Sequence, residues 1–301
     1  MDRSRMFPSY FQFWSHFEHS RATQPMSSTC SQAILISGAA GGLGQALVAE
    51  LARAGHRVFA GWHRTPLPPL APGVEAVALD VTCDDSCAAA AAVALARLGC
   101  LDAVIHAAGI TRDALLARQS PDDWDAIFAV NVEGAQRLAR ATLPILAGQG
   151  GGGHWITIGS HAGQTGSAGQ TAYAASKAAL NGLTLSWARE FAAHNVRINT
   201  VLPGVMPTPM TESLDPEVMR SYAQANVLGR INDPSEVARF ISFLLTTHNI
   251  SGQVFALDSR VHRWACPGRR FRAIVCPCPS RSRKPCASAW RRCVPRDCGD
   301  P

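Results

Sequence analysis

Three residues with reactive side chains stand out by their spacing: Ser160, Tyr173 and Lys177. If Tyr173-Ala-Ala-Ser-Lys177 is helical, the phenol and the ammonium stand one turn apart on the same face. A neighbouring cation favours the phenolate and so lowers the pKa of a phenol, ordinarily about 10. The pattern therefore predicts that Tyr173 is a general acid and that Ser160 holds a substrate oxygen beside it. The alternative is a tyrosine and a lysine on a solvated helix face.

A glycine-rich segment, Ser37-Gly38-Ala-Ala-Gly-Gly42-Leu43-Gly44, follows an apolar run and precedes a helical one. A strand before such a loop and a helix after it direct backbone N–H groups and the positive helix end at a pyrophosphate. The loop lacks Gly-Lys-Ser/Thr, which argues against a nucleoside-triphosphate P-loop. The predicted ligand is a dinucleotide, and a plain tight turn is the alternative.

The end of the second predicted strand distinguishes between the two nicotinamide dinucleotides. It reads Trp62-His63-Arg64, about twenty residues past the loop, where an acidic residue normally binds the ribose hydroxyls of NAD. No acid is present there, and Arg64 with His63 can receive a 2′-phosphate, so NADP(H) is favoured over NAD(H). A solvent-facing arginine is the alternative. Asp80 and Val81 are expected to border the adenine, unless Asp80 is only a helix cap.

From about residue 32, apolar β-type runs alternate with Ala/Leu-rich stretches, which is typical of parallel strands joined by crossover helices. We expect an α/β fold with a single Rossmann-type doubly wound parallel sheet of about seven strands and helices on both faces. The predicted strands are Ala33–Ser37, Arg57–Trp62, Val74–Leu79, Ala103–His106, Trp155–Gly159, Arg197–Val201 and Val254–Leu257. The predicted helices are Leu43–Ala54, Asp84–Leu98, Asp122–Leu146, Thr171–His194 and Ser235–Leu245.

Residues 203–230 interrupt this alternation with four prolines and three methionines. Long loops in compact domains are uncommon and often functional. The segment is therefore predicted to form a lid of loop and short helices over a pocket, rather than an ordinary connection.

The net charge of +6 is confined to one end of the chain. Residues 259–301 hold eleven Lys or Arg against two Asp, a charge of +9, and subtracting this from +6 leaves −3 for residues 1–258. A mildly acidic body argues against nucleic-acid binding. The sequence has no run of eighteen uncharged apolar residues and no apolar signal core, so we expect a cytoplasmic protein without a membrane segment.

Both ends differ in composition from the rest of the chain. Residues 1–31 are predicted to be a disordered extension, with Met26 as an alternative start, and residues 259–301 an Arg/Cys/Pro-rich tail that is disordered or aberrant. A zinc module is the alternative for this tail, but only Cys276 and Cys278 are closely spaced, so no metal is expected.

Together these motifs resemble the short-chain dehydrogenase/reductase family over about residues 32–258. The glycine loop is similar to that family's T-G-x-x-x-G-x-G, with Ser37 in place of threonine, and Pro203-Gly204 resembles the turn that borders the nicotinamide. The resemblance implies that Asn131 holds a water that returns a proton through Lys177, which also binds the nicotinamide ribose. The residues that match the family's catalytic group are Asn131, Ser160, Tyr173 and Lys177.

Two departures from the family pattern are visible. His106-Ala-Ala108-Gly109 stands where the family usually has Asn-Asn-Ala-Gly, so the amides that brace the central strand are absent, while Ala108 and Gly109 remain to border the cofactor. After Asp258, Ser259-Arg260 replaces a Gly-Gly turn and a short tail that packs at a subunit interface. The resemblance still implies a homo-oligomer, either a tetramer or a dimer.

Within the family, the segments around Asn131 and Ser160 and residues 202–211 look most like 3-oxoacyl reductases. The resemblance implies NADPH-dependent reduction of a 3-oxoacyl thioester, carried by acyl carrier protein, to the 3-hydroxyacyl thioester. Acetoacetyl-CoA or another small ketone or alcohol is the alternative, and carrier protein versus coenzyme A stays open. The cations available for an acidic carrier are His154, Arg189, Arg197, Arg220 and Arg230.

Two other classes of function remain. One is a nucleotide-sensing regulatory protein without chemistry, although a sensor need not keep all four catalytic residues. The other is a nucleic-acid or metal-binding role carried by the tail.

Overall fold

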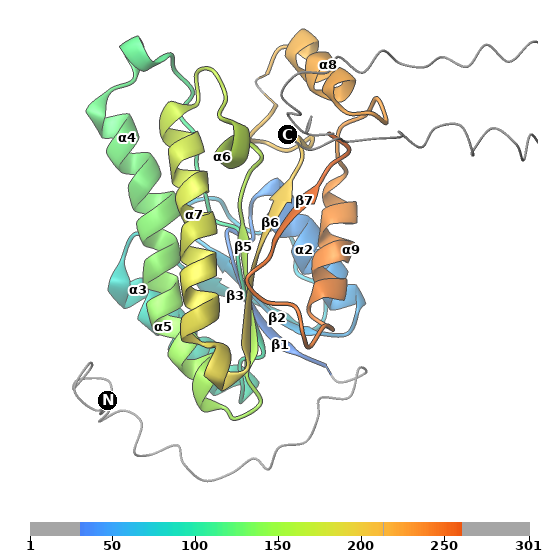
Figure 1. The fold of residues 1–301 in the computed structure, drawn as a ribbon. Helices are drawn as coiled ribbons and strands as arrows, with labels where there is room; N and C mark the ends of the chain where they lie inside the picture. Colours follow the sequence, from blue (N-terminus) through green and yellow to red (C-terminus); the bar gives the residue numbers. More distant parts are fainter. Residues whose placement is uncertain (1–30, 213, 261–301) are drawn as a thin grey trace, which may run out of the picture. The chain divides into compact units, whose positions relative to one another are not determined.

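The computed structural model describes residues 31–212 and 214–260, which are built on one sheet of seven parallel strands (Figure 1). The strand order is β3-β2-β1-β4-β5-β6-β7. The order reverses between β1 and β4, and ligands of such sheets bind outside the carboxyl ends of the strands at this point. The strands are β1 (Ala33–Ser37), β2 (Arg57–Trp62), β3 (Val74–Ala78), β4 (Ala103–His106), β5 (Gly153–Ile158), β6 (Val196–Pro203) and β7 (Val254–Leu257).

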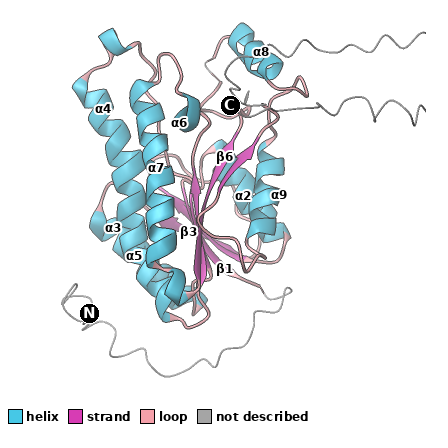
Figure 2. Ribbon diagram, viewed as in Figure 1, coloured by secondary structure: helices cyan, strands magenta, loops and turns pink. Residues whose placement is uncertain are grey.

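Helices cover both faces of the sheet, and Figure 2 shows the three layers. Helices α3, α5 and α7 pack on one face, and α2 and α9 on the other. The helices are α2 (Gly42–Arg53), α3 (Asp84–Leu98), α4 (Pro121–Phe128), α5 (Gly134–Gly148), α6 (Ala162–Thr165), α7 (Thr171–Glu190), α8 (Pro216–Ala225) and α9 (Pro234–Leu244). Short 3-10 turns lie at Leu116–Arg118 and Ala192–His194.

The predicted fold class is confirmed, and each predicted strand is present within two residues of its expected limits. The segment predicted as one helix over 122–146 is helical throughout, but it is not a regular α-helix along its whole length. A π-helical turn, Ala129–Glu133, separates α4 from α5. Its Asn131 side chain bonds to the backbone of Ile110, and a Cβ on Gly134 would lie 2.8 Å from Val81. The turn thus widens where a polar side chain must reach inward and the helix must pass close to a loop.

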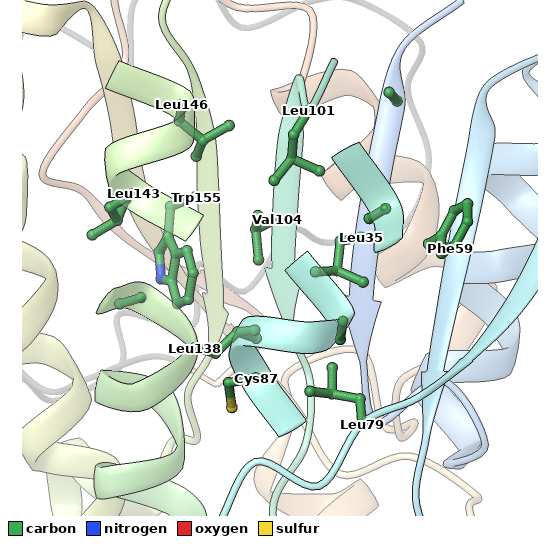
Figure 3. Packing of buried hydrophobic residues seen from close by; sticks show 14 of the residues in the cluster. Leu35, Phe59, Leu79, Cys87, Leu101, Val104, Leu138, Leu143, Leu146 and Trp155 are labelled. Atoms are coloured by element: carbon green, nitrogen blue, oxygen red, sulfur yellow. The ribbon is translucent and has the colours of Figure 1, made fainter. Parts of the chain in front are cut away.

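Each central strand is buried on both faces, which explains its continuous apolar sequence. In β1, Ala33 and Leu35 belong to the cluster under α3, α5 and α7, while Ile34 and Ile36 belong to the cluster under α2 and α9. Figure 3 shows the first cluster, in which Trp155 is the largest fully buried side chain. These two packed layers hold the carboxyl ends of the strands in fixed positions.

The described residues fall within one of two compact units, Met1–Val261; the other, His262–Pro301, lies outside the described residues. The predictions for the amino-terminal 30 residues, Met26 and the zinc alternative in the tail also lie outside them. Within the described part, no group of three or more His, Cys, Asp or Glu could hold a metal ion. None of the described helices combines the length and apolar character needed to cross a membrane.

Replacing Trp155 by alanine tests the core cluster under α3, α5 and α7. The ring is 0 % exposed, lies 5.8 Å edge-on from Trp187, and donates its N–H to Thr157 Oγ1 at 2.8 Å. Trp155→Ala is expected to lower the free energy of unfolding by about 3–5 kcal/mol, because it leaves a cavity and an unpaired hydroxyl. Urea denaturation measures this. The matched control, Trp124→Ala on the surface of α4, should cost less than about 1 kcal/mol, and equal losses would contradict the packing described.

Candidate active site

The four residues singled out as catalytic come from three segments of the chain that meet at the carboxyl edge of the sheet. Tyr173 and Lys177 lie in the first two turns of α7, Ser160 follows β5, and Asn131 lies in the π-helical turn. The Lys177 ammonium nitrogen is 5.7 Å from the centre of the Tyr173 ring, and the Ser160 side chain is close enough to the phenol to lower its pKa. The structure therefore brings the predicted group together.

Gly109 marks where this group meets the loop after β4. A Cβ at this position would lie 3.2 Å from Lys177 Nζ and 3.3 Å from Asn131 Oδ1. Any side chain here would push against both polar groups. The absence of a side chain keeps that space open for a ligand, as expected of a glycine beside a bound cofactor.

Asn131 is fully buried, and its amide is almost fully used within the protein. Oδ1 accepts a hydrogen bond from Ile110 N at 2.8 Å, and Nδ2 donates to Ile110 O and to Ser176 Oγ, each at 3.0 Å. Ser176 Oγ in turn donates to Tyr173 O at 2.7 Å. Both amide donors are thus occupied, so only one lone pair of Oδ1 remains in this side chain for the expected water. Asn131 ties the loop after β4 to α7.

Lys177 is 5 % exposed, and its ammonium donates to the carbonyl oxygen of Ile158 at 2.9 Å. Burial lowers the pKa of Lys177 to about 8, because a buried ammonium loses its hydration. Helix α6 packs closely on α7 here, since a Cβ on Gly163 would lie 2.7 Å from the backbone carbon of Lys177. The amine is therefore charged at neutral pH but able to release a proton slightly above it.

The electrostatics of Tyr173 differ from the sequence prediction. Burial raises the pKa of the phenol and outweighs the hydrogen bond with Ser160, which lowers it, while the Asp113 carboxylate raises it further. The expectation that Lys177 lowers this pKa is wrong for this structure. Its ammonium bonds to a backbone carbonyl rather than to the phenol. Tyr173 is consequently a protonated phenol at neutral pH.

The glycine loop has the geometry expected of a phosphate-binding turn. Gly38 follows β1 with φ +71°, and a Cβ there would lie 2.6 Å from Ala108 N; one on Gly44 would collide with Gly38 O. No side chain caps α2 at Gly41. The first N–H groups of a helix need external partners, so this helix start suits an anionic group.

The segment after β6 lies directly over this loop. A Cβ on Gly42 would lie 2.7 Å from Thr208, and one on Gly204 would lie 2.9 Å from Asn232 Oδ1. Pro203 is the last residue of β6, so Pro203-Gly204 stands at the carboxyl edge as expected. The first part of the predicted lid therefore contacts the predicted cofactor loop, and the lid motion stays a prediction.

The proposed 2′-phosphate site lies at the end of β2. His63 and Arg64 directly follow the strand and are exposed, and neither the end of the strand nor these two positions carries an acidic residue. His63 Nε2 lies 3.4 Å from Asp80 Oδ2. Although burial acts in the opposite direction, hydrogen bonds from Thr82 and the charges of His63 and Arg64 lower the pKa of Asp80. Asp80 is not the N-cap of α3, which is Cys83, and the neighbouring Val81 is buried.

His106 stands where the family usually has the first asparagine of Asn-Asn-Ala-Gly, and it braces the central strands in place of the asparagine amides. Its Nδ1 lies 2.9 Å from Ser37 Oγ across the β1–β4 pair, and Ala108 N donates to the same hydroxyl at 3.4 Å. Burial, with a smaller contribution from Lys177, lowers the pKa of His106 to about 3, so the ring is neutral. The central strands are therefore braced by a histidine–serine bond.

The cations expected to serve an acidic carrier are not all at the same end of the molecule. Arg220 on α8 and Arg230 after it are exposed beyond the carboxyl edge, and Arg220 pairs with Glu217 at 3.1 Å. The assignment of Arg189 and Arg197 to the pocket is wrong. Arg189 lies sixteen residues beyond Tyr173 on α7, about 24 Å along the axis.

His154 is excluded from the pocket in the same way. It lies at the start of β5, is 1 % exposed, and bonds to Arg197 at the start of β6. Because parallel strands run in one direction, both residues lie at the amino edge, opposite the catalytic group.

Sequence reasoning missed several partners of the site. These include the carbonyl of Ile158, the hydroxyl of Ser176 and the carboxylate of Asp113, which accepts from Gln170 Nε2 at 2.9 Å. A backbone carbonyl carries no signal in the sequence. Ser176, three residues after Tyr173, could have been found from helical spacing, since a serine at this distance reaches the preceding carbonyl.

The fold and the site can be compared with those of known protein families. A family model described as enoyl-(acyl carrier protein) reductase matches residues 38–262. The chain belongs to the short-chain dehydrogenase/reductase family and is an NAD(P)-dependent oxidoreductase acting on CH–OH groups.

Among curated proteins, the chain is 39% identical over 235 residues to the 3-oxoacyl-(acyl-carrier-protein) reductase FabG of Thermotoga maritima, covering 74% of this chain and 95% of that protein. It is 38% identical to the enzyme of the same name from Pseudomonas aeruginosa, with coverage of 70% and 88%. The (3R)-3-hydroxyacyl-CoA dehydrogenase of Rattus norvegicus is 43% identical over 141 residues, which span 47% of this chain and 54% of that protein.

One solved structure, titled ElxO with NADP bound, matches with a TM-score of 0.71 and 22% identity, covering 76% of this chain and 98% of that one. At this identity the likeness supports the fold alone.

The buried histidine gives a testable pH dependence. Since the pKa of His106 is about 3 in the folded protein against an ordinary 6.5, unfolding takes up a proton between these pH values. Stability should therefore fall as the pH falls below 6.5, by ~1.4 kcal/mol per pH unit from this residue. His106→Asn, which keeps a partner for Ser37, should reduce the slope by that amount.

Urea unfolding at pH 6.5, 5.5 and 4.5 measures the slope. The control is His194→Asn, which replaces an exposed histidine and should leave the slope as in the parent protein. An unchanged slope in His106→Asn would contradict the burial of a neutral ring.

Proposed function

We propose that the protein reduces a 3-oxoacyl thioester to the 3-hydroxyacyl thioester with NADPH, using Tyr173 as general acid. The observation that carries this proposal is the placing of Ser160 beside Tyr173, where it lowers the pKa of the phenol, next to a buried Lys177 and at the same sheet edge as the glycine loop. Two hydroxyl donors side by side suit a carbonyl oxygen that becomes an alkoxide. The full-length bacterial relatives named as 3-oxoacyl reductases support this substrate class.

The protonation state of Tyr173 supports the reductive direction. Burial and Asp113 raise the pKa of the phenol, so it holds its proton at neutral pH and can give it away. Ser160 and Tyr173 would donate hydrogen bonds to the substrate carbonyl, and Tyr173 would transfer its proton as negative charge develops on that oxygen. Lys177, with a pKa of about 8, is suited to return a proton to the phenolate.

The residues present fit a nicotinamide dinucleotide, which supplies the hydride when bound. The uncapped start of α2 would hold the pyrophosphate, and Gly109 and Pro203-Gly204 would border the nicotinamide. Arg64 and His63 would bind a 2′-phosphate, which favours NADP(H) over NAD(H). Lys177 also lies close enough to Gly109 to contact a ribose there.

Fewer cations are available to bind an acidic carrier than the sequence predicted. With Arg189, Arg197 and His154 at the amino edge, the exposed Arg220 and Arg230 are the candidates that remain for an acidic carrier protein. We retain acyl carrier protein as the proposed carrier and coenzyme A as the alternative, in a cytoplasmic homo-oligomer.

Steady-state kinetics on the purified full chain test the proposal. NADPH oxidation is followed with acetoacetyl and longer 3-oxoacyl thioesters, each on carrier protein and on coenzyme A, and with enoyl thioesters. Reduction of the 3-oxo compounds and not of the enoyl compounds is expected. Turnover of enoyl thioesters alone, which the description of the matching family model names, would overturn the substrate assignment.

Tyr173→Phe separates binding from chemistry. Removing the phenolic hydroxyl deletes the proposed proton donor, so turnover should fall by at least about 100-fold, while NADPH affinity from fluorescence titration should change little. The matched control, Tyr222→Phe on α8, removes another hydroxyl and should keep full turnover. Unchanged turnover in Tyr173→Phe would refute its role.

Arg64→Gln tests the choice of cofactor. Loss of a charge-assisted contact with the 2′-phosphate should raise the KM for NADPH about tenfold and leave that for NADH unchanged. Initial rates with both cofactors measure this, with Arg53→Gln, another exposed arginine, as the control. An equal rise for both cofactors would indicate a disturbed loop and contradict the assignment.

A further inference from the structure

A cavity of about 510 Å³ lies at the amino edge of the sheet, far from the catalytic group. It is open to solvent and is bordered by the last turns of α7, the start of β6 and the loop before β7. From Val196 to Pro203, β6 rises about 23 Å, so this cavity and the nicotinamide turn lie at opposite ends of the same strand. Its lining includes Leu185, Ala188, Arg189, Arg197, His248 and Ser251.

Arg197 is a buried cation without an acidic partner among the described residues. It is 4 % exposed, and burial lowers the pKa of its guanidinium. Nε donates to His154 Nε2 at 3.1 Å, and one terminal nitrogen donates to Asn195 Oδ1 at 3.1 Å. Both partners are neutral, since burial, followed by the charges of Arg197 and His248, lowers the pKa of His154 to about 3. A buried charge of this kind is unfavourable until an anion offsets it.

A second cation faces the same space. Arg189 is exposed and forms no ion pair with a described Asp or Glu, although several other surface arginines in the described part do. No Asp or Glu lines the cavity within the described residues. Asn195, Asn249 and Ser251 add neutral hydrogen-bonding groups. The charge of the cavity is therefore complementary to an anion.

Leu185, Ala188, Ala192 and Val196 form the apolar part of the lining, and His248 and Gly252 complete it. The volume lies within the range of about 300–1,000 Å³ that is usual for small-molecule sites. Guanidinium groups bind carboxylates and phosphates in a planar, two-bond arrangement. We infer that this cavity is a second binding site, which takes a small organic anion with a carboxylate or phosphate group on a short apolar body.

Isothermal titration calorimetry on the full chain tests the site, with hexanoate as the probe and hexanamide as its neutral analogue at constant ionic strength. Saturable binding of hexanoate and none of hexanamide is expected. Arg189→Gln should weaken hexanoate binding about tenfold, because one charge-assisted contact is lost. Arg197→Lys, which keeps the charge but loses the planar fork, should weaken it as well.

The matched control is Arg53→Gln, which removes an exposed arginine on α2 and should bind hexanoate like the parent protein. NADPH affinity should be unchanged in Arg189→Gln, which separates this site from the reaction site. The inference is overturned if hexanoate does not saturate, if hexanamide binds equally, or if hexanoate binding is indifferent to both Arg189→Gln and Arg197→Lys. It is also overturned if Arg189→Gln changes only the sedimentation of the protein, since the cavity would then be a contact between copies.

Discussion

One hydrogen bond, from the Lys177 ammonium to the carbonyl oxygen of Ile158, connects the two elements that carry the proposed chemistry. Ile158 ends β5, and Ser160 follows two residues later; Lys177 lies on α7 one turn after Tyr173. A buried ammonium must keep a hydrogen-bond acceptor, so the strand and the helix cannot shift independently without exposing or orphaning that charge. The phenol and the serine hydroxyl are held together as a consequence.

The cofactor side of the site is attached to the same cluster through glycines. Gly109 approaches Lys177 and Asn131, and Gly38 approaches Ala108, so the loops after β1 and β4 are packed on each other where the strand order reverses. The bond between Ser37 and His106 joins the ends of those two strands. A dinucleotide bound along this edge would therefore meet elements whose spacing is already fixed, which limits the ordering that binding requires.

Apolar runs and turn residues are sufficient to predict the strands and their parallel arrangement. Of the four residues expected at the edge, Ser160, Tyr173 and Lys177 follow from their spacing, whereas Asn131 follows only from the family resemblance. The π-helical turn at Ala129–Glu133 was not predictable, because its cause is a contact between Asn131 and Ile110 that the linear pattern does not contain. The direction in which the pKa of Tyr173 shifts is not predictable from the sequence for a related reason. Spacing places the lysine near the phenol, but burial decides whether the pKa of Tyr173 rises or falls. Burial in turn depends on the whole fold.

The position of Arg197, in contrast, could have been derived from the sequence. It begins the predicted strand whose other end carries Pro203-Gly204, and parallel strands all point their carboxyl ends at the site. A residue at the start of such a strand lies a full strand length away. Whether an arginine can reach the site depends on which end of its strand or helix it occupies, and not only on its exposure.

Lys177 and Arg197 show two outcomes for a buried cation in one fold. The lysine can release its proton, and burial lowers its pKa to about 8, so a backbone carbonyl is a sufficient partner and proton transfer becomes accessible. A guanidinium stays charged at any physiological pH, even where burial lowers its pKa. Neutral groups such as His154 and Asn195 accept hydrogen bonds from the Arg197 guanidinium but do not offset its charge. The cation that can titrate therefore suits catalysis, whereas the one that cannot is suited to binding an anion.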